Sequence, residues 1–294
     1  MPMNSYAFWL ARRGNSSAEY EDASAGNDAA GRYAVADGAT ESCFAGLWAR
    51  LLVEGFVNGA ACEAEPWIAS LPALQEQWDA DVRGRNLPWY AEPSVKQGAF
   101  ATFLGFMLTD SPLPYSGEGP GVRASYHWQA IAVGDTCLFH TRGTALLRAF
   151  PLEYSNQFDN APKLVGSRMF AQDIRNRQKL WADGQGQPGD RLWTMTDALA
   201  HWCLAEHEAG GNPWSEMESL LPPSPVPGRG AGGEGVNLPS PSGRGAGGEG
   251  VNLPSPVLGR GAGGEGNSFT QWIEGLRDSG RLRNDDVTLL AIRL

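Results

Sequence analysis

The pattern of apolar and polar positions predicts strands and helices over most of this chain. Apolar or alternating runs typical of strands cover 6–11, 31–36, 99–109, 126–133, 137–141, 145–150, 190–196 and 287–294. Apolar residues at helical spacing predict helices over 43–59, 66–83, 198–208 and 268–280. Pro72 is expected to split or kink the second of these helices. The strands in the middle of the chain follow one another without an intervening helix, which predicts antiparallel sheet.

Two Pro/Gly-rich segments interrupt this pattern. Residues 111–123 read as a long hairpin loop between two strands. In 221–266 the motif GRGAGGEG occurs three times, starting at Gly228, Gly243 and Gly259. Such repeats have almost no apolar side chains to stack into a core, so we interpret 221–266 as a disordered insertion.

Composition and charge narrow the class of protein. With 42% hydrophobic residues and 11 tryptophans, the chain can build a packed core. A formal charge of −10 disfavours nucleic acid or an anionic membrane surface as a partner. The four cysteines show no metal-binding or disulfide spacing, and the apolar run 7–10 is too short for the core of a signal peptide. No run is long enough to span a membrane, so we expect a cytoplasmic protein.

Carboxylates stand at the edges of several predicted strands. They are Glu21 with Asp22, Asp37, Asp197, and Asp285 with Asp286. Asp37 is followed by Gly38, a pair that more often marks a simple hairpin turn. Clustered carboxylates repel one another unless a cation neutralises them, and hard oxygen ligands suit Mg²⁺ or Mn²⁺. Two such ions can hold a hydroxide and stabilise a phosphoryl group, so phosphoester hydrolysis is the natural chemistry of this pattern.

The motifs around these carboxylates resemble a known family. They are EDA at Glu21, VADG at Val35, VGDT at Val133, TMTD at Thr194 and NDDVTLL at Asn284. In order and spacing this series is similar to the metal-dependent protein phosphatases of the 2C type, and it covers most of the chain outside the two Pro/Gly-rich segments. The resemblance implies a single phosphatase-like domain over 1–294. It also implies an α+β fold of two packed antiparallel sheets with helices on both outer faces.

The resemblance assigns roles to residues of this chain. It implies that Asp37 bridges two metal ions, Mn²⁺ or Mg²⁺, and that the carbonyl group of Gly38 binds one of them. Asp197 and Asp285 bind the other ion, and Asp285 is preferred to Asp286 because the family's ligand stands three residues before the Thr. Glu21 and Asp22 orient metal-bound waters. Asp135 matches the family's structural Gly-Asp turn and is given no metal role.

Several positions depart from the family pattern. Ser17 stands where the family has an arginine that holds the substrate phosphate, and Arg12 and Arg13 lie a few residues earlier. Arg13 is the candidate to replace it, since a guanidinium offers two donors to phosphate. Ala198 stands where the family usually has a glycine after the third aspartate. Ala39 stands at the position of a proposed proton donor. The four histidines match no catalytic position, and we expect them to serve hydrogen bonding.

Three functions remain open from the sequence. The first is an active serine/threonine phosphatase that acts on phosphoproteins. The second is a phosphatase fold that has become a catalytically weakened or inactive binding or regulatory module, which Ser17 and Ala198 favour. The third is a hydrolase of small phosphoesters. The physiological substrate, the choice between Mg²⁺ and Mn²⁺, and the oligomeric state leave no motif in the sequence.

Overall fold

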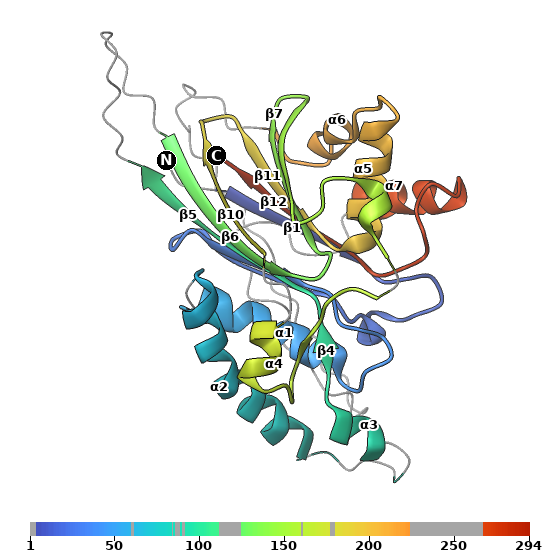
Figure 1. The fold of residues 1–294 in the computed structure, drawn as a ribbon. Coiled ribbons are helices and arrows are strands. Elements are labelled where there is room, and N and C mark those ends of the chain that lie inside the picture. The colour runs from blue at the N-terminus through green and yellow to red at the C-terminus, as the bar shows by residue number, and fades with distance from the viewer. Residues whose placement is uncertain are drawn as a thin grey trace, which may run out of the picture.

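Two five-stranded antiparallel sheets form the centre of the computed structural model (Figure 1). The structure describes residues 4–59, 62–83, 85, 89, 92–111, 125–159, 161–176, 180–223 and 267–294. The first sheet has the order β1 (Asn4–Leu10), β12 (Val287–Arg293), β11 (Arg191–Met195), β7 (Cys137–Arg142) and β8 (Ala145–Phe150). The second has the order β10 (Leu180–Gly186), β6 (Ser125–Val133), β5 (Phe103–Ser111), β3 (Arg32–Ala36) and β2 (Ala23–Asn27). A short pair, β4 (Phe100–Ala101) and β9 (Val165–Gly166), lies beside them.

Helices cover the outer face of each sheet (Figure 1). On the second sheet lie α1 (Ala45–Val57), α2 (Ala64–Arg83) and α4 (Ala171–Asn176). On the first sheet lie α5 (Asp197–Glu208), α6 (Pro213–Glu218) and α7 (Asn267–Asp278). The remaining short helices are α3 (Glu92–Gln97) and the 3₁₀ turns Ser17–Glu19 and Ser155–Gln157. The fold is therefore the four-layer arrangement implied by the resemblance, and that prediction is confirmed.

Three apolar clusters separate the four layers. The central cluster lies between the sheets and includes Tyr33, Phe106, Trp128 and Leu290. A second cluster packs α1 and α2 on their sheet, and a third packs α5 and α7 on the other. Strands such as β12, buried from Val287 to Ile292, face apolar layers on both sides and so read as continuous apolar runs.

The two ends of the described chain meet in one sheet. β1 pairs with β12 in antiparallel register from Asn4 opposite Arg293 to Leu10 opposite Val287. Each strand therefore satisfies the backbone groups of the other at the edge of the first sheet. None of the helices in the described ranges has the length and apolar character needed to cross a bilayer.

Several elements differ from the sequence expectation. α2 continues through Pro72 without a break, because residues on both sides of it, among them Ile68 and Trp78, are buried in the same core. The pattern did not predict β2, β10 or α6. In β10 the buried positions are small, and a Cβ at Gly184 would lie 2.5 Å from the Trp128 ring. The hairpin loop 111–123 and the insertion 221–266 fall outside the described residues, except for 111 and 221–223.

The insertion gives a first prediction. Replacing Pro222 to Gly266 by a short glycine–serine linker should leave the thermal midpoint close to that of the full chain. Any metal-dependent kcat/KM should stay within about twofold of the full-chain value. The removed sequence carries three Arg and three Glu, so it adds no net charge. Shortening a loop changes its closure entropy by only ~0.6 kcal/mol per twofold change in length. A tenfold fall in kcat/KM would mean that the segment recruits substrate or covers the site.

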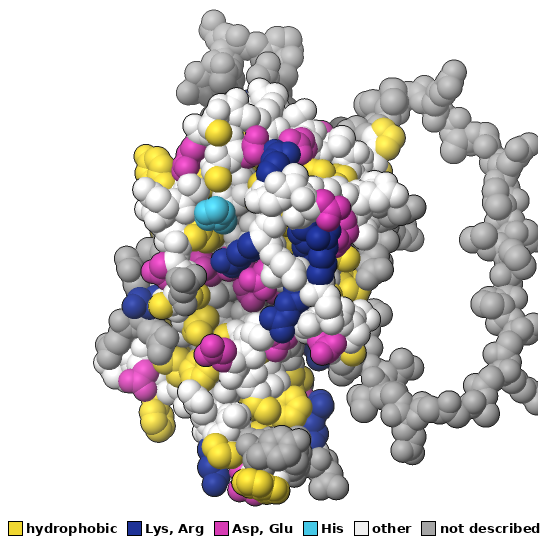
Figure 2. Space-filling view, turned by 90° about the vertical axis from the view of Figure 1, so that its right-hand side faces the viewer, with side chains coloured by type: hydrophobic (Ala, Val, Ile, Leu, Met, Phe, Trp, Pro, Cys, Tyr) yellow, Lys and Arg dark blue, Asp and Glu magenta, His cyan; other side chains and the backbone are white. Residues whose placement is uncertain are grey.

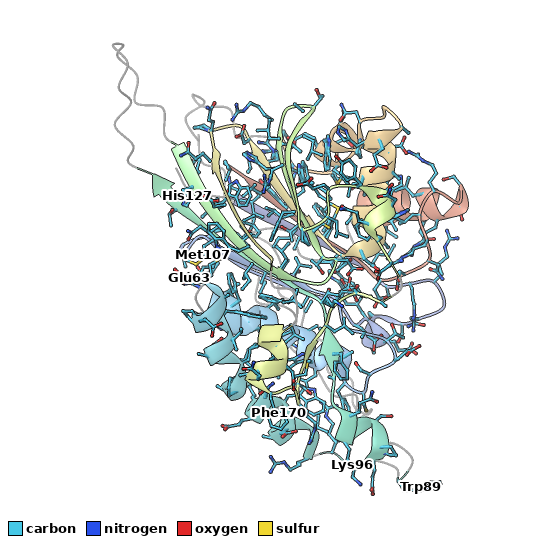
Figure 3. All side chains as sticks on the ribbon, in the orientation of Figure 1. Glu63, Trp89, Lys96, Met107, His127 and Phe170 are labelled. Carbon is cyan, nitrogen blue, oxygen red and sulfur yellow. The ribbon has the colours of Figure 1, made fainter. Side chains whose placement is uncertain are left out.

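A buried ionic network lies at the start of β11. Asp190 is 1% exposed and accepts hydrogen bonds from Arg142 Nε at 2.7 Å and Nη2 at 2.9 Å, and from the Gln187 backbone N–H at 2.9 Å. His140 Nε2 lies 2.9 Å from the same carboxylate. This confirms a hydrogen-bonding role for His140, while His127 on β6 lies near the surface (Figure 3), 3.4 Å from Asp183.

This network predicts a loss of stability in acid. Burial lowers the pKa of His140 below its usual value of 6.5, although Asp190 acts in the opposite direction. A lowered folded-state pKa means that the stabilisation is complete above the unfolded value and is lost as the pH falls below it. Buried carboxyl groups with raised pKa values elsewhere in the chain act in the opposite direction over the same range, so the effect of His140 appears as a difference. Between pH 7.5 and 5.5 the free energy of unfolding of the unsubstituted protein should fall relative to that of His140→Gln. Denaturant melts of that variant and of His127→Gln as a control measure it, and equal slopes in all three would contradict it.

Candidate functional site

Asp22 and Asp37 are brought together by the register of one hairpin. In the β2–β3 pair Ala23 lies opposite Ala36, so the residues just outside the ladder, Asp22 and Asp37, lie opposite each other. Each of the two carboxyl groups lies close enough to shift the pKa of the other. The backbone carbonyl of Asp37 accepts a hydrogen bond of 2.9 Å from Thr102 N–H, which fixes the chain where β3 ends. Local sequence placed each aspartate at a strand edge, and the register joins them.

The first sheet contributes carboxylates at the same end of the sandwich. Asp197 follows β11 directly, and Asp285 and Asp286 precede β12, its antiparallel neighbour. Asp135 follows β6 and precedes β7. Asp37, Asp135 and Asp197 line one cleft of about 550 Å³. Asp135 therefore lies in the acidic site, although the sequence reading gave it no part there.

Side chains from β12 hold the buried Asp22. Thr288 Oγ1 donates to Asp22 Oδ2 at 2.8 Å, which links the two sheets. Thr288 N–H in turn donates to Thr196 Oγ1 at 3.0 Å, and the hydroxyl groups of Tyr20 and Thr288 are in close contact. Sequence reasoning missed Tyr20, Thr196 and Thr288 because their part in the site depends on contacts between distant strands.

Asp286 holds the backbone of the segment that contains Arg12 and Glu21. Its Oδ1 accepts a hydrogen bond from Arg12 N–H and its Oδ2 one from Glu21 N–H, both of 2.8 Å. Both carboxylate oxygens are thus engaged by the segment that carries Glu21 and Asp22. The choice of Asp285 as the ligand candidate stays a prediction.

Crowding and burial raise the pKa values of these carboxyl groups. Burial, with a smaller contribution from Asp286, raises the pKa of Asp22 to about 7. Burial and the charges of Asp22 and Asp135 raise the pKa of Asp37 well above its usual range. Burial also raises the pKa of Asp135 to about 6. The described protein groups alone therefore do not neutralise this cluster at neutral pH.

Gly38 stands where no side chain fits. A Cβ at this residue would lie 2.7 Å from the backbone oxygen of Glu21 and 2.9 Å from Ala45. The chain after Asp37 therefore runs close against the segment of Glu21 and the start of α1. This close approach explains the glycine.

The donor set suits a hard divalent cation. Asp22 and Asp135 are 6% and 5% exposed, and Oδ1 of each is buried with no hydrogen-bond partner in the described part of the chain. Buried carboxylate oxygens without donors are the ligands that Mg²⁺ or Mn²⁺ prefers. As the side chains of the described residues stand, no three His, Cys, Asp or Glu are arranged around one metal position. An arginine explains part of this, because Arg283 contacts Asp197 closely and lies 3.4 Å from Asp285 Oδ2.

The candidate phosphate ligand Arg13 points to a helix. Its Nη2 lies 2.6 Å from Asp278 Oδ1 and 3.1 Å from the carbonyl oxygen of Glu274, both on α7. Arg12 instead lines a cavity of about 780 Å³ together with Ser17 and Glu21. The structure thus places Arg12, and not Arg13, on the wall shared with the acidic residues.

The surface at one side of the molecule carries both signs of charge. Figure 2 shows basic and acidic side chains interspersed over the face seen from the right of Figure 1. Among the described residues on that face, Lys and Arg are not gathered into a basic stripe of the kind that binds nucleic acid.

Comparisons with known proteins identify the fold. No protein-family model matches the sequence, and a search of curated proteins found no match. Among solved structures, the Mycobacterium tuberculosis serine/threonine phosphatase PstP/Ppp is 13% identical with a TM-score of 0.52, and the match covers 100% of this chain and 99% of that one. The catalytic domain of PstP in complex with two manganese ions gives 13% identity and a TM-score of 0.52, covering 99% and 97%. A bacterial serine phosphatase is 12% identical with a TM-score of 0.52, and the match covers 99% of this chain and 97% of that one.

These matches define the class of fold. The described part of this chain has the two-sheet sandwich found in these bacterial phosphatases. At this level of identity the likeness shows the fold, and the architecture implied by the sequence resemblance is thereby confirmed.

Proposed function

We propose that this chain is a divergent 2C-type phosphatase that hydrolyses phosphoserine and phosphothreonine in proteins with Mn²⁺ or Mg²⁺. The observation that carries the proposal is the meeting of carboxylates from both sheets at one end of the sandwich. Among them are oxygens of Asp22 and Asp135 that are buried with no donor among the described residues, and such oxygens fit a cation. The manganese-bound PstP domain, which has the same fold, supports this assignment.

Each residue has a role in the proposal. Asp37 would hold both ions, the carbonyl oxygen of Gly38 would bind one of them, and Asp197 and Asp285 would bind the other. Glu21 and Asp22 would orient metal-bound water. When bound, the ions lower the pKa of water and neutralise the phosphoryl oxygens. Thr288 fixes Asp22, and Asp286 fixes the backbone of Glu21, so the acidic side chains are held before substrate arrives.

We propose a phosphoprotein substrate and a cytoplasmic location. The structure describes all four cysteines, and each is a free thiol, three of them buried. Free thiols are typical of a reducing compartment. The open cleft of about 550 Å³ leaves room for a phosphorylated side chain carried on a protein surface.

The test is a turnover assay with controlled metal. Purified protein is incubated with p-nitrophenyl phosphate and with phosphoserine and phosphothreonine peptides, in Mn²⁺, in Mg²⁺ or in chelator. We expect hydrolysis of the peptides in either metal and none in chelator. Turnover of p-nitrophenyl phosphate alone would favour the hydrolase of small phosphoesters, and an absence of metal-dependent turnover on every substrate would refute the proposal.

A specific observation favours the binding module as the second candidate. Arg283 pairs with Asp197 and Asp285, two of the expected ligands, and Ser17 removes a phosphate contact. In this alternative the cleft binds a phosphorylated partner without hydrolysis. Saturable binding of a phosphopeptide by protein that shows no turnover in Mn²⁺ would select it.

The two arginines give a prediction about substrate binding. Arg13→Ala should change KM by less than about threefold, because its partners are Glu274 and Asp278 on the surface of α7. Arg12→Ala should raise KM by about tenfold if its guanidinium supplies the donors that Ser17 lacks. Steady-state kinetics on one phosphopeptide decides between them. A strong rise for Arg13→Ala alone would restore Arg13 as the phosphate ligand.

A further inference from the structure

Arg283 places a positive charge inside the acidic site. It lies in the loop between α7 and β12, and its guanidinium contacts Asp197 and reaches Asp285 Oδ2 at 3.4 Å. Its charge also acts on Asp135, where it opposes the rise in pKa that burial causes. One side chain thus serves carboxylates that follow β11, precede β12 and follow β6.

The backbone of this loop is fixed while the Arg283 side chain can move. Arg277, whose side chain is 2% exposed, donates to the carbonyl oxygens of Asp285 at 2.5 Å and Ala11 at 3.2 Å. Arg283 is 45% exposed, so its guanidinium can turn into solvent without disturbing this anchor. Ion pairs at this exposure are individually weak, so a stronger cation can replace them.

Arg283 and a metal ion compete for the same oxygens. A guanidinium brings one positive charge spread over a planar group, whereas Mn²⁺ brings two on a compact ion that prefers carboxylate oxygen. We infer that Arg283 is an internal counter-ion of the Asp197–Asp285 pair and that a divalent cation binds this pair by displacing it. The inference rests on the proposed metal site and adds a residue that sets its affinity.

The test measures metal binding directly. Mn²⁺ is titrated calorimetrically into chelator-treated, full-length protein carrying Arg283→Ala, Arg283→Lys or no substitution. Removing the competing charge should lower the Kd of the tighter site by about fivefold to tenfold. Arg283→Lys, which keeps the charge without the fork, should fall between the two.

Arg281 provides a matched control in the same loop. It is 41% exposed and also pairs with two carboxylates, Glu206 at 2.7 Å and Glu216 at 3.8 Å, both away from the site. Arg281→Ala should have a Kd for Mn²⁺ within about twofold of that of the unsubstituted protein. It removes the same charge, but from a side chain that pairs with Glu206 and Glu216 and not with the proposed ligands. An equal gain in both alanine variants would show a general charge effect and overturn the inference.

The outcomes separate this inference from the proposed function. An unchanged or weaker Mn²⁺ affinity in Arg283→Ala, or no Mn²⁺ binding by it at all, overturns the inference. Thermal melts in chelator confirm that each variant is folded before titration. Tighter Mn²⁺ binding by Arg283→Ala without phosphopeptide turnover would support the inference while contradicting the phosphatase activity.

Discussion

Asp37→Asn should lower kcat by on the order of 10³-fold while leaving the protein folded. The charges of Asp22, Asp135 and Asp285 all act on Asp37, which lies among the proposed ligands. An amide of equal size keeps the packing and the backbone contact to Thr102 but cannot supply a bridging negative charge. Because the substitution also relieves repulsion, the thermal midpoint in chelator should be equal or higher.

The control for this variant is Asp183→Asn on β10. Asp183 is a surface carboxylate whose partner is His127, near the other end of β6 (Figure 3). It should retain the full kcat with phosphopeptide in Mn²⁺. If Asp37→Asn kept most of its activity, or if Asp183→Asn lost as much, the bridging role of Asp37 would be wrong.

Asp190→Ala should have the opposite result, a large loss of stability with little change in kcat. The variant removes the acceptor shared by Arg142, His140 and the Gln187 backbone N–H. Because charge-assisted hydrogen bonds of a buried carboxylate are lost, the free energy of unfolding should fall by about 2–4 kcal/mol. The loss is not larger because the freed Arg142 can reach solvent. For a chain of this size that is a fall of about 5–12 °C in the thermal midpoint.

Asp190 and Asp197 stand at opposite ends of β11, which makes this variant informative. Measured at a temperature where it is still folded, Asp190→Ala should keep its Mn²⁺ affinity and kcat within about twofold. Arg191→Ala serves as the control for the region: Arg191 pairs with the partly exposed Glu218 and donates to the carbonyl oxygens of Gly189 and Asp190, so its loss should cost about 1–2 kcal/mol. A loss of metal binding in Asp190→Ala would show that the two ends of the sandwich are coupled.

The site could be predicted in part from the sequence. Asp37, Asp197 and Asp285 each follow or precede an apolar run, and that position is readable without a structure because a strand edge is a local feature. Asp135 belongs to a Gly-Asp pair that reads as a turn, and the sequence did not show that this turn lines the cleft. Nothing in the sequence indicated that Arg283 lies at the site, since a lone arginine in a polar loop usually lies in solvent.

Elements whose burial is regular could be predicted from the amino-acid sequence alone. β12 and α1 were predicted because a strand buried on both faces and a helix with one apolar stripe impose their periods on the chain. β2 and β10 were not predicted because the small residues at their buried positions differ little in hydrophobicity from the exposed positions beside them.

Which carboxylates lie together, and which arginine pairs with them, depends on the packing of the two sheets. The β2–β3 register sets Asp22 opposite Asp37, the packing of the sheets brings Thr288 to Asp22, and a long side chain carries Arg283 to Asp197. These contacts join residues far apart in the chain, and electrostatic interactions depend on distance in space and on burial. Local sequence therefore placed the charged groups at the ends of strands, and the packing of two sheets made them one site.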